Sequence, residues 1–211
     1  GIMLMDLKIV GTCHSDDLMV DIFVRPDSPI AISGPGHIPE YPTLYGTPDD
    51  WRGINVLGPS GTTGHYALVS ALKALGLSEK DITLTNMQVP AANTAFKAGE
   101  GDAVIQWLAL SVDAENQGWV KAATCHNVGA DNPSIIYASN KAVTEHPDLV
   151  QDILDIYYKA TAWMSQEENF EKSVDYFYEF LNDNGVANTR DECEKVLATI
   201  PYHTVAESKA Y

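Results

Sequence analysis

Residues 53–77 read GINVLGPSGTTGHYALVSALKALGL: a short apolar run, a loop of Gly, Ser and Thr, and apolar residues at helical spacing. This order predicts a β-strand, a turn and an amphipathic helix. The first turn of a helix has unpaired N–H groups and a partial positive charge, so the loop is suited to a small anion. Ser60, Thr62 and Thr63 add hydroxyl donors, and Gly61 allows close backbone approach. The alternative is an ordinary N-capped helix, since Ser and Thr are common caps.

The segments that follow repeat this strand–helix order. Residues 81–87 predict a strand, and residues 89–107 predict a short helix and a further strand that ends in Trp107. Parallel strands joined by helices imply right-handed crossovers, with ligands beyond the carboxyl ends of the strands. The loop has neither the Lys of a phosphate-binding loop nor the glycine spacing of a dinucleotide fingerprint, which argues against nucleotides. We therefore expect residues 60–65, 88–91 and 106–108 to share one edge of a sheet.

The rest of the chain predicts two early strands and a helical end. Strands are expected at residues 7–11 and 18–25, with a polar turn at 12–17, and the Pro- and Gly-rich residues 28–50 predict a loop. Helices are expected over residues 148–166, 169–181 and 189–198. In the first of these, apolar residues at helical spacing predict a stripe that faces the core: Leu149, Ile153, Ile156, Tyr157, Ala160, Trp163 and Met164.

Charge and composition exclude several classes of partner. The formal net charge of −16 argues against nucleic acid and anionic membrane surfaces. No run approaches the roughly 20 apolar residues that span a bilayer. Residues 2–4 are hydrophobic but are soon interrupted by Asp6 and Lys8, so we expect no signal peptide in this chain.

The cysteines and hydroxyl residues do not suggest a metal, a cofactor or catalysis. Three widely spaced cysteines without a CxxC pair argue against a disulfide framework and a structural zinc site. The pairs Cys13-His14 and Cys125-His126 are better explained as thiols beside loop histidines than as metal ligands. Ser60 lacks the Gly-x-Ser-x-Gly pattern of a nucleophile elbow. We expect no catalytic residues, no bound metal and no cofactor.

Several segments, in order, resemble the periplasmic solute-binding proteins of nitrate, sulfonate, taurine and thiamine-precursor ABC importers. They include DWRGINV, ALKALGL and AFKAGEGDA and cover residues 21–30, 50–56, 71–77, 82–87, 95–107 and 133–150. The resemblance implies an α/β fold like type II periplasmic-binding proteins: a βαβ lobe with a parallel-rich sheet, plus the helical C-terminal part of a second, incomplete lobe.

The same resemblance implies a division of the chain. Residues 28–133 would form lobe 2, with the Pro-rich insertion at 28–50, and residues 1–27 and 134–211 would supply parts of lobe 1. The opening of lobe 1 in that family has no counterpart here. A half-built lobe exposes sheet edges and apolar helix faces, so we expect a partner chain, a second fragment or self-association to cover them.

The function implied is solute capture for an ABC-type importer, in the periplasm or at the cell surface, with a membrane permease as partner. The ligand would be a small organic or inorganic anion, and the sequence does not choose among nitrate, sulfonate, taurine, carboxylate or a heterocycle. The alternatives are a ligand-sensing or orphan binding module of the same fold and a thiamine-pyrimidine-related protein.

The expected ligand site lies in a cleft between the lobes. In lobe 2, the loop residues Ser60, Gly61, Thr62 and Thr63 would hold an acidic head group. His65 or Tyr66 would add a side-chain contact, Trp107 would form an apolar wall, and Gln106 would be an alternative polar contact. From lobe 1, the resemblance implies contacts by His14 and Ser15. The expected hinge comprises Arg25, Asp131, Asn132 and Pro133.

Overall fold

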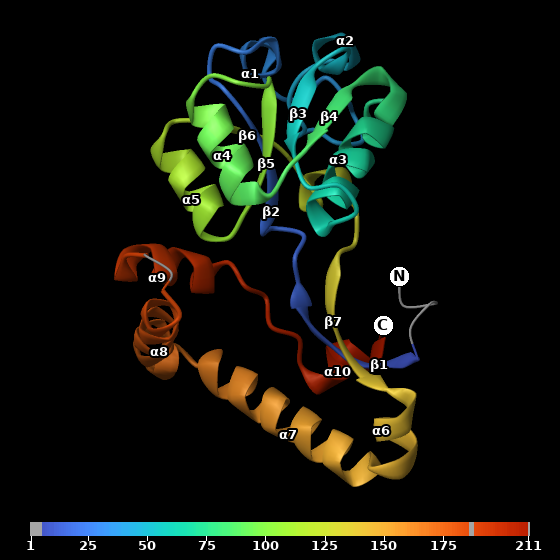
Figure 1. Cartoon of the computed structure of the whole chain (residues 1–211), viewed down its shortest axis with the longest axis vertical. Helices are drawn as coiled ribbons and strands as arrows, with labels where there is room; N and C mark the ends of the chain where they lie inside the picture. Colours follow the sequence, from blue (N-terminus) through green and yellow to red (C-terminus); the bar gives the residue numbers. More distant parts are fainter. Residues whose placement is uncertain (1–5, 186–187, 211) are drawn as a thin grey trace. The chain divides into compact units, whose positions relative to one another are not determined.

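The structure, a computed structural model, describes residues 6–185 and 188–210. It divides into two compact units (Figure 1). Unit 2 is Asp16–Asn132, and unit 1 combines the stretch that ends at Ser15 with the stretch that starts at Pro133. The hydrophobic residues 2–4, which bear on the expectation about a signal peptide, lie outside the described residues.

Unit 2 is built on a five-stranded sheet in the order β4-β3-β5-β2-β6. Strands β3, β4 and β5 run parallel, and β2 runs antiparallel to both β5 and β6. The predicted α/β class with a parallel-rich sheet is confirmed. The elements of unit 2 are β2 (Val20–Val24), α1 (Pro29–Ser33), α2 (Pro48–Trp51), β3 (Asn55–Gly58), α3 (Thr63–Ala74), β4 (Thr83–Asn86), α4 (Val89–Lys97), β5 (Ala103–Trp107), α5 (Ala109–Asn116) and β6 (Val120–Thr124).

Helices cover both faces of this sheet, as Figure 1 shows. Successive side chains of a strand point to opposite faces. Ile22 and Ile105 accordingly pack with α3 in one apolar cluster, whereas Phe23 and Val104 pack with α4 and α5 in another. All four side chains are fully buried. Burying a side chain of this size stabilises the fold by roughly 1.5–3 kcal/mol, so the two clusters fix the helices on the sheet.

The region predicted as a continuous loop, residues 28–50, begins and ends in short helices, so that prediction was wrong at both ends. Ser28 Oγ accepts a hydrogen bond from the Ala31 N–H at 3.1 Å, and Thr47 and Asp50 form a reciprocal capping box. Proline follows each cap at the first helical position, where its missing N–H costs nothing. Two of the prolines that suggested a loop, Pro29 and Pro48, therefore start helices.

Unit 1 contains a two-stranded antiparallel sheet and most of the helical end of the chain. The predicted turn at residues 12–17 was wrong at its start, because β1 continues to Ser15 by pairing with β7 through two register shifts. The elements of unit 1 are β1 (Leu7–Ser15), β7 (Pro133–Ser139), α6 (Asn140–Glu145), α7 (Pro147–Met164), α8 (Phe170–Asp183), α9 (Arg190–Ala198) and α10 (Val205–Ala210).

Helix α7 faces unit 1 with a different stripe from the one predicted. Leu149, Ile153 and Ile156 are 57%, 54% and 67% exposed, and Ala160 is exposed as well, so the prediction of a core position was wrong for these four. The helix instead approaches β1 through Tyr158, whose hydroxyl donates to the Thr12 carbonyl at 2.9 Å. None of the helices in residues 6–185 and 188–210 is long and apolar enough to cross a membrane.

The predicted boundary between the two parts of the chain also moves. Residues 16–27 were assigned to the first lobe, but β2 lies in the middle of the sheet of unit 2, paired with β5 on one side and β6 on the other. The hydrogen-bonded pairing of β2 with both β5 and β6 places this strand in unit 2, although it follows β1 of unit 1 closely in sequence. That the two units are the lobes of a two-lobed binding protein stays a prediction.

Gly64, in the first turn of α3, provides a test of the packing in unit 2. A Cβ at this position would lie 2.3 Å from Ile105 Cγ2. Gly64→Ala should therefore lower the free energy of unfolding, because overpacking costs about 1–3 kcal/mol and the gain in helix propensity is about 1 kcal/mol at most. Urea unfolding measures this. Val69→Ala, on the exposed side of the same helix, is the control and should change the value by less than about 0.5 kcal/mol; equal stability of the two variants would contradict the close contact.

Candidate functional site

The carboxyl ends of the three parallel strands of unit 2 meet at one edge of the sheet. Each strand leads through a turn into a helix: β3 into α3, β4 into α4 and β5 into α5. In open α/β sheets this edge is where ligands bind. The loop before α3, the indole of Trp107 and the starts of α3 and α4 all lie at this edge, as the sequence predicts. The edge is therefore the candidate site.

The turn between β3 and α3 is held by its own side chains. Thr62 caps the helix: its Oγ1 accepts from the His65 N–H at 3.4 Å and donates to the Pro59 carbonyl at 3.0 Å. Gly61 has φ +70°, a left-handed conformation that favours glycine. The hydroxyl hydrogen of Thr62 is thus used within the turn, although the sequence suggested it for a ligand.

Two of the predicted backbone donors are also used internally. The Ser60 N–H donates to Asn86 Oδ1 at 2.9 Å, and the Gly61 N–H donates to His65 Nδ1 at 3.0 Å. Since Nδ1 accepts, the hydrogen of the neutral ring is on Nε2, which lies 2.6 Å from Glu79 Oε1. His65 therefore fixes the turn by bonds on both sides of its ring.

The remaining donors at this turn point out of the helix start. Among the described residues, no acceptor is found for the N–H groups of Thr62, Thr63 and Gly64. Thr63 is exposed and carries a hydroxyl. Three N–H groups at a helix N-terminus, with a hydroxyl beside them, have the chemistry to hold a small anion.

Trp107 lies against this helix start. A Cβ on Gly64 would be 3.2 Å from Trp107 Cζ3, so the indole and the first turn of α3 are in close contact. Trp107 also packs against a buried cluster that contains Cys125. Burial raises the pKa of the Cys125 thiol to about 12, with a further contribution from nearby carboxylates. The thiol is thus a neutral packing group, and the part of the indole that is not buried forms an apolar surface beside the N–H donors.

The structure does not bring Gln106 to this surface as predicted, whereas a ligand contact by Tyr66 stays a prediction. Gln106 is fully buried on the α4 and α5 side of the sheet, where its Nε2 donates to Asn93 Oδ1 at 3.1 Å. Tyr66 is on α3 and is 45% exposed. Of the residues predicted in lobe 2, Thr62 and Thr63 belong to the helix start that lies against Trp107.

His14 and Ser15 end strand β1 in unit 1, so their contribution to a shared site stays a prediction. Asn132 and Pro133 lie where unit 2 ends and unit 1 resumes, beside the other crossing at Ser15. Arg25 is fixed inside unit 2 instead: its guanidinium donates to three carbonyl oxygens of residues 96–101 at 2.8–2.9 Å and lies 3.9 Å from the centre of the Phe96 ring. It closes the end of α4 and does not lie at either crossing.

The sequence places Leu108 at this edge but does not predict its backbone conformation. It directly follows Trp107 and has φ +52° and ψ −130°, a strained conformation for a residue with a side chain. Such strain costs of order 1–3 kcal/mol and is commonly found at functional sites. No sequence signal pointed to this conformation, because Gly or Asn would be expected in it.

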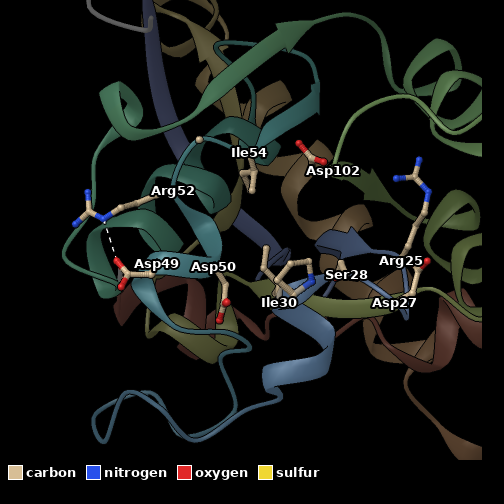
Figure 2. A pocket seen from close by; sticks show the side chains of 11 residues that line it. Arg25, Asp27, Ser28, Ile30, Asp49, Asp50, Arg52, Ile54 and Asp102 are labelled. Carbon is tan, nitrogen blue, oxygen red and sulfur yellow. Dashed lines mark hydrogen bonds and ion pairs between the residues drawn. The ribbon is translucent and has the colours of Figure 1, made fainter.

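A cavity of about 600 Å³ lies at the opposite end of the strands, where residues preceding β3 and β5 meet the end of β2. Figure 2 shows Arg25, Arg52 and Asp102 around it. Each of these charges closes a turn: Arg52 contacts Asp81 at 2.9 Å, and Asp102 Oδ2 accepts from the Asn55 N–H at 2.8 Å. The described residues also include no group of three or more His, Cys, Asp or Glu placed to hold a metal. The cavity is therefore explained by the packing of the turns.

Comparison with known proteins identifies the family of the chain. Residues 45–169 match the profile of a family described as NMT1/THI5 like. The chain belongs to this family. The match runs from the residues before β3 to the end of α7 and so includes the whole candidate edge.

Relatives of this NMT1/THI5-like protein include transport proteins. A Brachyspira hyodysenteriae protein, provisionally named as an ABC transporter periplasmic binding protein, is 23% identical over 190 residues, which cover 90% of this chain and 54% of that protein. The taurine-binding periplasmic protein of Escherichia coli is 26% identical over 135 residues, covering 59% and 42%. The crystal structure of the Escherichia coli periplasmic aliphatic sulphonate-binding protein SsuA matches with a TM-score of 0.74 at 22% identity, covering 93% and 56%. The chain thus has the fold of these binding proteins and spans about half the length of the curated relatives.

Hydrogen exchange tests the internal bonds of the turn in this NMT1/THI5-like protein. His65→Ala removes the acceptor of the Gly61 N–H. A hydrogen bond contributes about 0.5–1.5 kcal/mol, so the Gly61 amide should exchange about two- to tenfold faster. The Ser60 amide, held by Asn86, is the internal control and should not change. Asn86→Ala should give the reverse pattern, and an unchanged Gly61 rate in the His65 variant would contradict the assigned bond.

Proposed function

We propose that this protein is the solute-binding component of an ABC-type importer and that it binds a small organic anion without chemical turnover. The observation that carries the proposal is the contact between an indole and a helix start that keeps free N–H groups. The N–H groups at residues 62–64 supply donors for the acidic head group, and Trp107 supplies an apolar wall for the body of the ligand.

The donors favour an oxyanion with several oxygens. A sulfonate presents three acceptor oxygens and one apolar substituent, which matches three N–H groups beside an aromatic ring. The taurine-binding and aliphatic sulphonate-binding relatives support a ligand of this class. The net charge of −16 does not oppose binding at this distance, because distant charges are screened beyond about 10 Å at 0.1 M salt.

The place of action and the partner follow from the same proposal. Relatives named as periplasmic binding proteins support a location in the periplasm or at the cell surface and a membrane permease as partner. The hypothesis that the two units are the lobes of this binding protein, with His14 and Ser15 facing the ligand from unit 1, belongs to this proposal as well.

Thr63→Val tests the anion site. The change removes the exposed hydroxyl and keeps the shape of the side chain, so affinity for taurine or hexanesulfonate should fall by about 1.5–3 kcal/mol, the contribution of a hydrogen bond to a charged group. Isothermal titration calorimetry on the whole chain measures the affinity, and recovery of intact sulfonate after incubation distinguishes binding from turnover.

Thr62→Val is the matched control. It removes a helix cap and should cost about 1 kcal/mol of stability, whereas Thr63→Val should leave the unfolding midpoint almost unchanged. Equal affinity of wild type and Thr63→Val would show that the hydroxyl does not contact the ligand. Consumption of the sulfonate would overturn the proposal that the protein only binds.

We also propose that unit 1 self-associates through its exposed apolar residues on β1, β7 and α7: Ile9, Tyr137, Leu149, Ile153 and Ile156. Light scattering should show a mass that rises with protein concentration, and Ile153→Glu should reduce it. Ile32→Glu changes an exposed isoleucine of unit 2 and is the control. A monomer at every concentration would contradict self-association.

A further inference from the structure

A row of buried polar groups crosses the α4 and α5 face of the sheet in unit 2. Asp21 on β2 lies directly opposite Gln106 on β5 in the antiparallel register. Opposite residues of paired strands point to the same face, so the two side chains are neighbours. Asp21 is 1% exposed and Gln106 is 0% exposed, and neither group has a role in the site described above.

The orientation of the Gln106 amide is fixed by a chain of hydrogen bonds that begins at the Lys97–Asp113 ion pair. Lys97 Nζ lies 2.6 Å from Asp113 Oδ2, and this carboxylate also accepts from Asn93 Nδ2 at 3.0 Å. A carboxylate accepts only, so the amide of Asn93 must direct its NH₂ toward Asp113 and its oxygen the other way. That oxygen accepts from Gln106 Nε2, which leaves Gln106 Oε1 as the free end of the chain of bonds.

Two buried acceptors then meet without enough donors. Within the described residues, neither Asp21 Oδ1 nor Gln106 Oε1 has a hydrogen-bond partner. Ser111 Oγ on α5, which is close enough to Asp21 to influence its pKa, has a single hydrogen to give. An unsatisfied buried acceptor costs about 1–3 kcal/mol. One additional proton would remove the deficit.

The charges around Asp21 do not compensate for its burial. Burial raises the pKa of Asp21 to about 6, against the lowering effect of Lys121 on β6. Lys121 Nζ lies 3.4 Å from Asp21 Oδ2 but 3.0 Å from Glu115 Oε1 on α5, so Glu115 competes for it. The positive charge of Lys97 on α4 is directed at Asp113. On the β6 side, the buried Cys125 thiol is neutral and adds no compensation.

We propose that Asp21 is a proton-binding site of unit 2: its protonated carboxyl donates to Gln106 Oε1 and joins β2 to β5 beneath the end of the strand that carries Trp107. The proton comes from solvent and returns to it as the pH rises. Asp21 then becomes a buried carboxylate, and two acceptors again face each other.

The direction of the pH effect follows from linkage. The folded form holds the proton more tightly than the unfolded chain, so the site stabilises unit 2 fully below about pH 4, and this contribution is lost as the pH rises through about 6. A shift of about two pKa units corresponds to a change of about a hundredfold in the folding equilibrium constant.

Asp21→Asn tests the proposal, because asparagine is the neutral isostere and its NH₂ can donate to Gln106 Oε1. In a Trp163→Phe background, tryptophan fluorescence reports unit 2, since the other three tryptophans lie there. Urea unfolding of the whole chain is followed between pH 4 and pH 8. The Asn variant should be about as stable as the parent at pH 4 and should gain up to about a hundredfold in the folding equilibrium constant over it by pH 8.

Asp81→Asn is the control. Hydrogen bonds from Ser78 lower the pKa of Asp81, so its removal should destabilise the protein at pH 8 and have less effect at pH 4. Carboxyl ¹³C NMR of the wild-type chain provides a readout that does not depend on a variant folding. Titration of Asp21 near pH 6 supports the proposal. Titration near pH 4, or the same pH dependence in the parent and Asp21→Asn, overturns it.

Discussion

The contact of Gly64 with Ile105 and Trp107 determines both the packing of unit 2 and its candidate site. Helix α3 can lie directly on the end of β5 only because position 64 has no Cβ. The same approach places the N–H groups of the helix start beside the indole. A larger residue would separate the helix from the strand, so the core and the anion donors would be lost together. The geometry of the candidate edge is thus a consequence of core packing.

The parts of the fold that could be predicted from the sequence are those set by local chemistry. The strand, turn and helix of residues 53–77 depend on neighbours within a few positions. The place of β2 depends on pairing with β5 and β6, which are distant in sequence. The α7 stripe shows the same limit: its spacing predicts an amphipathic helix but not which face meets the rest of unit 1. Leu108 departs from local preference altogether.

The loop sequence predicts more free donors in this turn than the structure leaves. Ser, Thr and Gly predict that donors exist, whereas Asn86 and His65 decide which donors remain. Asn86 comes from the neighbouring strand, and the His65 ring turns back from the helix, so neither bond is visible in the loop itself. These two bonds leave only the N–H groups of the first helical turn free, so the candidate site is that turn and not the whole loop. A turn held in this way is preorganised, which reduces the entropy lost when a ligand binds.

The buried polar row in unit 2 shows why Asp21 stands in an otherwise apolar strand, VDIFV. Each bond from Lys97 through Asp113 and Asn93 fixes the direction of the next. The amide of Gln106 must therefore donate its NH₂ to Asn93, which leaves Oε1 as an acceptor. A hydrophobic residue at position 21 would leave that acceptor unsatisfied, whereas a carboxyl can bring its own hydrogen. A carboxyl is therefore compatible with this position only because it can be neutral. Its protonation then acts on β5, the strand whose end carries Trp107, and so connects the charge state of the core to the edge where the ligand is proposed to bind.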